Sequence, residues 1–170
     1  MSIIRRICTP WRMKYISAPK EQKCVFCENI KENNDEKNLI LLRGDYCFVM
    51  LNLYPYNNGH LMVIPYSHKD NLIYLTKEEY TELMFLAQVS IEALTRVMMP
   101  HGFNLGMNIG TSAGAGIADH IHLHIVPRWE GDSNFMLTIA ETKIIPEDLP
   151  STYRKLQPVM KAIYEEKKKP

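Results

Sequence analysis

Three histidines alternate with aliphatic residues in the segment His120–Val126, whose sequence is HIHLHIV. Side chains two residues apart on a β-strand point to the same face, so a strand here places three imidazoles in one row and turns the aliphatic side chains toward a core. An imidazole attacks phosphorus well when a hydrogen bond holds the proton on one ring nitrogen and leaves the other lone pair free. A neighbouring imidazole can then deliver a proton to the leaving oxygen. One histidine at such a position would more often be structural, but three in register favour phosphoryl transfer.

A loop of small residues, 110–119, precedes the histidines. Glycines such as Gly114 and Gly116 allow backbone N–H groups to approach a phosphate closely. Glycine-rich turns also commonly serve only to connect two elements. The loop adds to the histidine pattern and would carry little weight without it.

Cys24 and Cys27 form a C-x-x-C pair, which can supply two thiolates to one metal ion. A zinc ion with cysteine and histidine ligands normally requires four of them, so two more would have to come from elsewhere. The alternative is a pair of free thiols in a turn. A redox motif is disfavoured because no strand pattern precedes the pair and no helical pattern follows it.

The remaining sequence indicates the elements that position these residues. Short apolar runs separated by turn-forming residues predict three strands in a meander, and two further strands flank the glycine loop, the last of them ended by Pro127. The expected strands cover residues 39–42, 46–51, 60–64, 103–109 and 120–126. The sequence therefore predicts an α+β fold with a mostly antiparallel five-stranded sheet.

Two helices are expected beside this sheet. Thr76 and Glu79 have the spacing of a capping box, and apolar residues then recur at helical steps up to Met98. A C-terminal helix is expected from Leu149 onward, where Pro158 implies a kink or a late start.

Composition limits the functional class. The 170 residues include 20 Lys and Arg against 19 Asp and Glu, so no bulk attraction to nucleic acid is expected. The first residues contain no apolar run long enough for a signal peptide or a membrane span, which predicts a cytoplasmic enzyme without membrane contact. We expect an N-terminal extension with the cysteine pair at 1–30, a catalytic domain at 31–148, and a C-terminal helix with a charged tail at 149–170. Cys47 is expected to be a buried thiol.

The segment His120–Val126 matches the H-φ-H-φ-H-φ-φ signature of the histidine triad superfamily, where φ is apolar. Asn52 before the Gly59-His60 step resembles the ribose-binding asparagine of that family, and Asn108 resembles the polar residue that opens its phosphate loop. The resemblance extends over roughly residues 24–135 and implies a histidine triad fold.

Within the superfamily, the chain looks most similar to the diadenosine tetraphosphate phosphorylases and hydrolases of the fragile histidine triad branch. The resemblance implies that His122 attacks the α-phosphorus, that His124 contacts the phosphate and the leaving oxygen, and that His60 orients the site. It also implies that Asn52 holds the ribose hydroxyls, with Gly114 and Gly116 in the phosphate loop. Met50 and Met62 would line an adenine pocket, or they pack in the core.

The chain departs from that branch just before the triad. It has Gly116, Ile117 and Ala118 where the branch has a Gln and a Ser or Thr, which leaves the leaving-group contacts open. Trp129 has two interpretations, stacking on a base or simple packing. Two other functions are considered, a nucleoside phosphoramidate hydrolase and a nucleotide-binding module without turnover.

Several histidine triad proteins have a zinc site built from an N-terminal C-x-x-C, a histidine after the Gly-His strand and the first triad histidine. That pattern implies that His68 and His120 join Cys24 and Cys27 around a structural zinc ion. Histidine triad proteins are typically homodimers, and the resemblance implies the same for this chain.

Overall fold

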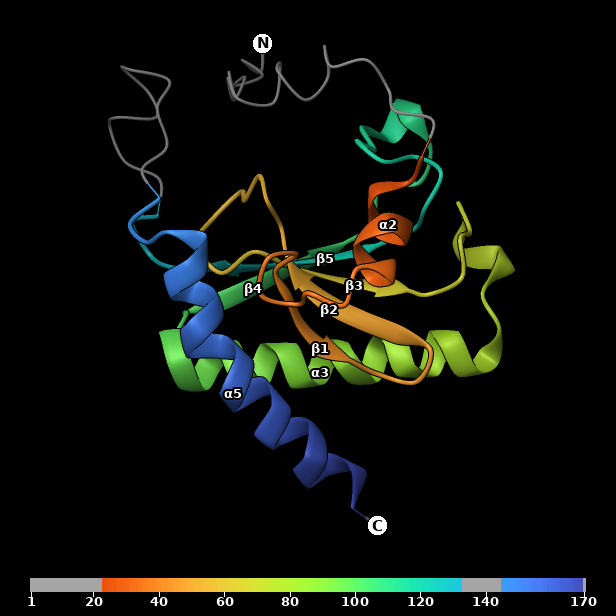
Figure 1. Ribbon diagram of the computed structural model, residues 1–170. Helices are drawn as coiled ribbons and strands as arrows, with labels where there is room; N and C mark the ends of the chain where they lie inside the picture. Colours follow the sequence, from red (N-terminus) through yellow and green to blue (C-terminus); the bar gives the residue numbers. More distant parts are fainter. Residues whose placement is uncertain (1–22, 133–144, 170) are drawn as a thin grey trace, which may run out of the picture.

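The computed structural model describes residues 23–132 and 145–169, and these form one antiparallel sheet with helices on both of its faces (Figure 1). The five strands lie in the order β1-β2-β3-β5-β4, and β1, β2 and β3 form the predicted meander. The strand bounds are Ile40–Arg43 for β1, Cys47–Leu51 for β2, Leu61–Pro65 for β3, Gly102–Gly106 for β4 and Leu123–Arg128 for β5. The predicted α+β class and five-stranded sheet are confirmed.

Both predicted helices are present. The helix α3, Lys77–Met98, begins at the predicted capping box, in which the Thr76 and Glu79 side chains each accept a hydrogen bond from the other's backbone N–H. The helix α5, Leu149–Lys168, starts at an Asp148 cap and continues through Pro158, so the late start considered from the sequence does not occur. Within the described residues, neither these helices nor any other is long and apolar enough to cross a membrane.

Three shorter helical segments complete the described chain. They are α2, Val25–Lys31, and the 3-10 turns η1, Leu72–Tyr74, and η2, Thr111–Ala113. The helix α2 was not predicted, and the expectation that no helix follows the cysteine pair is wrong, because α2 continues past Cys27 to Lys31. Only Phe26 is buried among its seven residues, so the helix shows too little apolar periodicity to be recognised.

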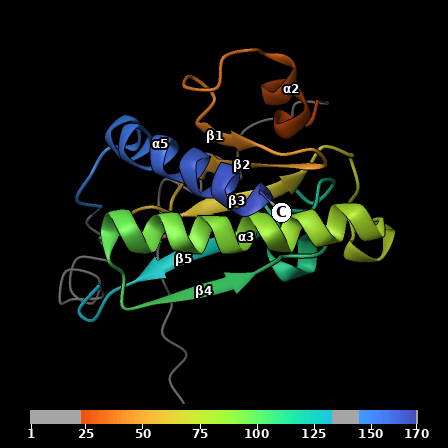
Figure 2. The same ribbon diagram turned by 90° about the horizontal axis from the view of Figure 1, so that it is seen from below.

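The sheet is covered on both faces, with α3 and α5 on one side and α2 beside the other (Figures 1 and 2). Side chains alternate between the two layers: Val49 and Val63 join the core beneath α3 and α5, whereas Met50 and Met62 join Phe26 of α2. Because every residue of β2 and β3 is buried, these strands appear in the sequence as continuous apolar runs. Cys47 is fully buried, as predicted, and burial raises the pKa of its thiol to about 12.

The strand β5 begins three residues later than predicted and ends later. If the β3–β5 register continued past the Val63–Leu123 pair, Pro65 would face Ile121, but proline has no N–H for the ladder. The N–H of Ile121 instead donates to the carbonyl oxygen of Lys69 at 2.6 Å. Pro127 does not end the strand, since it pairs with Phe103 of β4 beyond the last residue that β3 pairs.

Other strand boundaries differ from expectation by one to three residues, and two of these differences bear on the site. The strand β3 starts at Leu61 rather than at His60, and β4 ends at Gly106, three residues before Ile109. Asn108 therefore lies in the connection that leads to η2 and not on a strand. The predicted division into residues 1–30, 31–148 and 149–170 stays a prediction, and Cys8 lies outside the described residues.

Candidate active site

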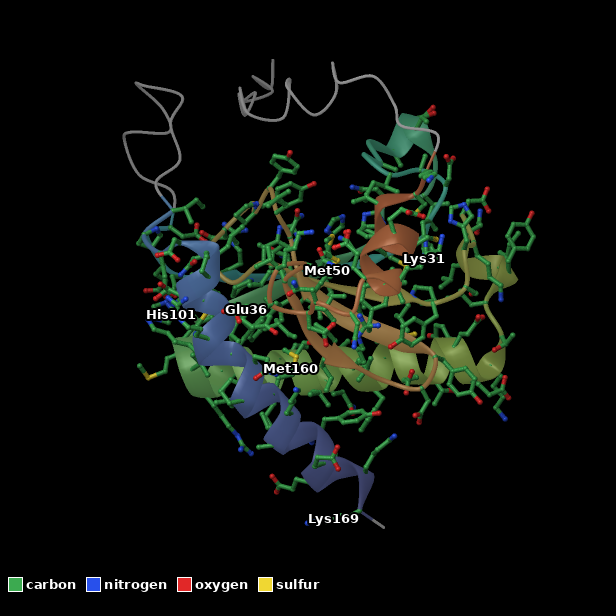
Figure 3. The ribbon with its side chains drawn as sticks, viewed as in Figure 1. Lys31, Glu36, Met50, His101, Met160 and Lys169 are labelled. Carbon is green, nitrogen blue, oxygen red and sulfur yellow. The ribbon has the colours of Figure 1, made fainter. Side chains whose placement is uncertain are left out.

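A cavity of about 260 Å³ lies between α2 and the face of the sheet opposite α3 and α5. Met50, labelled in Figure 3, lies close to α2 and lines the cavity on the side of the sheet. The lining residues come from α2, from three strands and from the loops around them: Val25, Phe26, Asn29, Met50, Asn52, Leu53, Tyr54, Tyr56, Met62, Asn108, Gly116, Ile117, His122 and His124. Met50 pairs with Met62, and Met62 pairs with His124, so these three form a row across β2, β3 and β5.

His122 is held in one tautomer by the backbone. Its Nδ1 lies 2.8 Å from the carbonyl oxygen of His120, and since a carbonyl can only accept, Nδ1 carries the hydrogen. The neutral ring therefore keeps its lone pair on Nε2. His122 is only 5% exposed, and this burial lowers the pKa of the imidazole, which favours the neutral form. A neutral imidazole with a free lone pair on Nε2 is the form that can act as a nucleophile.

His60 and His124 form a hydrogen-bonded pair beside it. The backbone N–H of Tyr56 donates to Nδ1 of His60 at 3.0 Å, so His60 carries its hydrogen on Nε2. That atom lies 2.9 Å from Nδ1 of His124, which accepts, and the hydrogen of His124 is therefore on its Nε2. The rings of His122 and His124 have centroids 4.7 Å apart. A nucleophilic lone pair and an N–H donor thus occupy adjacent imidazoles.

The turn before β3 explains why a glycine precedes His60. Gly59 has φ +71°, and a Cβ on it would lie 2.7 Å from the sulfur of Met98 on α3. A side chain at this position would be strained at this φ and would force the Met98 side chain to shift. The turn places the Tyr56 N–H within hydrogen-bond distance of Nδ1 of His60, which sets the tautomers of His60 and His124.

The other predicted substrate-binding residues divide into two groups. Asn52, Asn108 and Gly116 line the cavity, and Oδ1 of Asn52 accepts a hydrogen bond from the Tyr54 N–H at 2.9 Å. Gly114 is exposed at the end of η2 and is not among the described residues that line the cavity. Trp129 is not among them either.

The contribution of α2 to the cavity was not predicted from the sequence. Phe26 is 2% exposed, and its ring lies against His120 and His122 with centroid distances of 5.5 and 5.2 Å. The available signal was the pair of apolar residues Val25 and Phe26 inside the C-x-x-C. Spacer residues of a metal motif are easily overlooked as candidates for a pocket wall.

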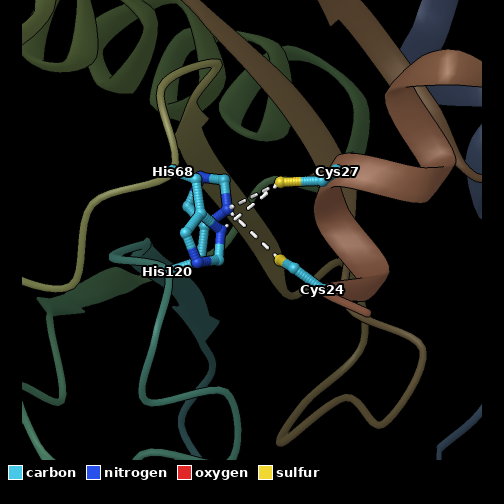
Figure 4. Close-up of side chains that lie close together, drawn as sticks. All are labelled: Cys24, Cys27, His68 and His120. Carbon is cyan, nitrogen blue, oxygen red and sulfur yellow. Dashed lines mark hydrogen bonds between the residues drawn. The ribbon is translucent and has the colours of Figure 1, made fainter. Parts of the chain in front are cut away.

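The four predicted metal ligands come together at one end of α2. The ligand atoms of Cys24, Cys27, His68 and His120 all lie within 4.8 Å of one another (Figure 4). Nδ1 of His120 is 3.3 Å from the Cys24 sulfur and 3.6 Å from the Cys27 sulfur, and Nδ1 of His68 is 3.4 Å from the Cys27 sulfur. In a zinc tetrahedron with standard bond lengths, a sulfur and a nitrogen ligand lie about 3.5 Å apart.

The protonation of His120 also fits a metal ligand. Its Nε2–H donates to the carbonyl oxygen of Pro65 at 2.9 Å, which leaves the lone pair of Nδ1 directed toward the thiols. His120 is fully buried, and this burial, together with His68 and His122 nearby, lowers the pKa of the ring. Two thiols and two imidazoles form a donor set that zinc prefers, so these residues fit the ion.

Comparison with known proteins agrees with this geometry. The family model described as the HIT domain, the histidine triad domain, matches residues 33–131. The chain therefore belongs to the histidine triad family. It is 44% identical over 162 residues to a protein from Mycobacterium tuberculosis named AP-4-A phosphorylase, with 90% of this chain and 83% of the relative covered. These matches confirm the prediction of a histidine triad protein and the prediction of an enzyme.

Solved structures share the fold. A zinc-bound histidine triad family protein from Mycobacterium smegmatis is 23% identical with a TM-score of 0.67, covering 85% of this chain and 97% of that one. A hypothetical histidine triad nucleotide-binding protein from Sulfolobus tokodaii is 26% identical with a TM-score of 0.63, covering 84% and 93%. These likenesses establish the histidine triad fold predicted from the sequence.

Proposed function

We propose that this protein cleaves dinucleoside polyphosphates such as diadenosine tetraphosphate at the α-phosphorus, through a covalent nucleotidyl intermediate on His122. The observation that carries the proposal is the carbonyl of His120, which holds the proton on Nδ1 and leaves Nε2 of His122 as the attacking atom. The AP-4-A phosphorylase that is 44% identical supports this choice of substrate.

The reaction would proceed in two displacements. In the first, a bond forms between Nε2 of His122 and the α-phosphorus while the bond from phosphorus to the bridging oxygen breaks, releasing ATP from diadenosine tetraphosphate. In the second, an oxygen of inorganic phosphate or water attacks the same phosphorus and the phosphorus–nitrogen bond breaks. Phosphate would yield ADP and water would yield AMP, and the proton of the acceptor passes to the medium.

The tautomer of His124 favours a polyphosphate over an amine as the leaving group. Because its Nδ1 accepts from His60, His124 is neutral and offers an N–H donor on Nε2. A nucleoside polyphosphate leaves as a stabilised anion and needs only such a hydrogen bond, whereas an amine leaving group must take up a full proton. This arrangement supports polyphosphate cleavage over phosphoramidate hydrolysis.

Product analysis tests the proposal. Incubation of diadenosine tetraphosphate with the protein, with and without inorganic phosphate, should give ADP and ATP in the first case if phosphate is the acceptor. AMP and ATP under both conditions would indicate hydrolysis. Absence of turnover, together with release of an amine from an adenosine phosphoramidate, would replace the proposal with phosphoramidate hydrolysis, and tight binding without either reaction would indicate a binding module.

We also propose that the metal held by Cys24, Cys27, His68 and His120 is a structural zinc ion. Four protein ligands leave no open position for water, so the ion would fasten α2 to the residues before β5 and take no part in the reaction. Metal analysis of protein purified without added metal should give about one zinc per chain. Less than about one tenth of an equivalent would remove this assignment.

Two further proposals concern the setting of the enzyme. A homodimer is supported by the family resemblance and by β4, an edge strand whose Leu105 is 44% exposed. A monomer at micromolar concentration in light scattering would contradict it. A cytoplasmic location is supported by the reduced state of Cys24, Cys27 and Cys47, since thiols and thiolate ligands persist in a reducing compartment.

A further inference from the structure

The cavity has a reacting end and an apolar end. The row across the sheet leads from His124 through Met62 to Met50, away from the reacting histidines. Phe26 of α2, whose ring centroid lies 5.2 Å from that of His122, packs in one cluster with both methionines and so joins the reacting end to the apolar end. If His122 attacks the α-phosphorus and Asn52 holds the ribose, the base of the nucleotide extends into this apolar end.

One polar side chain at the apolar end has no part in the proposed reaction. Asn29 lines the cavity from α2, one helical turn after Val25 and three residues after Phe26, so the three share a face of the helix. Its backbone carbonyl accepts a hydrogen bond from the side chain of Asn38 at 3.2 Å, which ties this turn of α2 to the following loop. Among the described residues, none forms a hydrogen bond with the Asn29 amide group.

Asn29 is half-buried, so water can bond to its carboxamide in the free protein, and a ligand that displaces this water must offer matching hydrogen-bond groups. The carboxamide oxygen accepts and its nitrogen donates, a pattern that matches the N6 amino group and N7 of adenine in a bidentate pair. Hypoxanthine and guanine present two acceptors at the same edge, so they leave the oxygen of the carboxamide facing another acceptor. The chemistry of this position therefore distinguishes adenine from 6-oxopurines.

We propose that Asn29 is a specificity-determining residue that binds the N6 and N7 edge of the adenine base. This inference rests on the proposed function, because the cavity must hold a nucleotide in the stated direction. Asn29 contributes to the choice of base and leaves the chemistry at His122 unchanged.

Binding of AMP, IMP and 7-deaza-AMP to the full-length protein, measured by calorimetry, tests this inference. Wild-type protein should bind AMP about tenfold more tightly than IMP, with 7-deaza-AMP in between, as expected for one or two hydrogen bonds. Asn29→Leu should bind the three ligands within about twofold of one another. Glu28→Gln, on the same helix but not lining the cavity, is the matched control and should retain the wild-type preference.

The outcomes separate this inference from the proposed function. If wild-type protein binds 7-deaza-AMP and IMP as tightly as AMP, or if Asn29→Leu keeps the wild-type preference, Asn29 does not bind the base edge. Turnover of diadenosine tetraphosphate is measured on the same proteins. If turnover is normal and Asn29→Leu does not change the selectivity, only this inference is overturned. If Asn29→Leu loses the preference for AMP but wild-type protein shows no turnover, only the proposed reaction is overturned.

Discussion

The two walls of the cavity are held in different ways. The sheet wall belongs to β2, β3 and β5, with core packed on both faces of β2 and β3, and backbone groups set the tautomers of its histidines. The opposite wall is α2, seven residues with one buried side chain. A helix of that length is not stable by itself in water, so its position depends on its attachments.

Because the two walls are held differently, we expect them to contribute differently to the rate of the reaction and to the affinity for nucleotide. Backbone hydrogen bonds fix the tautomers of the histidines that we propose as nucleophile and donor, whereas the position of α2 depends on Cys24 and Cys27 and the imidazoles they approach. Changes to the sheet wall should therefore affect the rate of the reaction most. Changes to α2 should affect nucleotide binding and stability most.

The largest effect is expected from His122→Asn. The carboxamide keeps polarity and approximate size but cannot attack phosphorus, so turnover should be abolished while nucleotide affinity stays within about tenfold. Rapid mixing of wild-type protein with labelled substrate should give a protein-bound label that survives alkali and is lost in mild acid. Near-normal turnover by His122→Asn, or a label on another residue, contradicts the mechanism.

A smaller loss of rate is expected from His124→Asn. This change removes the N–H donor for the leaving oxygen, whose assistance is typically worth about 10²–10⁴-fold, while water can partly replace it. Single-turnover kinetics should show slower formation of the intermediate with little change in nucleotide affinity. An intermediate formed at the wild-type rate would mean that His124 does not assist departure.

Metal removal should weaken nucleotide binding rather than eliminate the chemistry. Treatment with a chelator should lower the melting temperature and raise the Kd for AMP about tenfold or more, since the contact with Phe26 is lost when α2 detaches. The double variant Cys24→Ser, Cys27→Ser should show the same defect and no further change with chelator, which is the control. His120→Asn should also lose metal and stability. An unchanged Kd for AMP after complete metal loss would mean that the metal does not hold α2 in the position needed for nucleotide binding.

The smallest effect is expected from Asn52→Ala. Loss of a ribose hydrogen bond should weaken AMP binding by roughly 0.5–1.5 kcal/mol, and the protein should remain folded because the side chain lies at the cavity. Deoxyadenosine monophosphates provide the control, since they lack a ribose hydroxyl and should lose less affinity with the variant. An unchanged Kd for AMP would count against the assigned ribose site.

Local patterns predicted much of this structure. The meander, the capping box of Thr76 and Glu79, and the grouping of the four metal ligands all follow from spacing or from family resemblance. The helix α2 could not be predicted because Phe26 is its single buried residue. Phe26 packs against Met50 and Met62, which lie on other elements, so no local pattern shows that it is buried. The late start of β5 depends on Pro65 of β3, which would lie opposite Ile121. The sequence around Ile121 does not show which residue lies opposite it.

The proline at the end of β3 has a wider consequence. Since Pro65 cannot extend the ladder, the three residues from His120 to His122 are left without regular pairing, and their polar groups are used by the site. The Pro65 carbonyl then accepts the hydrogen bond that orients His120. In a comparison of sequences, Pro65 would look like an ordinary end of a strand. Because it has no backbone N–H, however, the ladder between β3 and β5 stops there, and the residues opposite are available to the site. Sequence comparisons of such proteins should weigh this position together with the histidines.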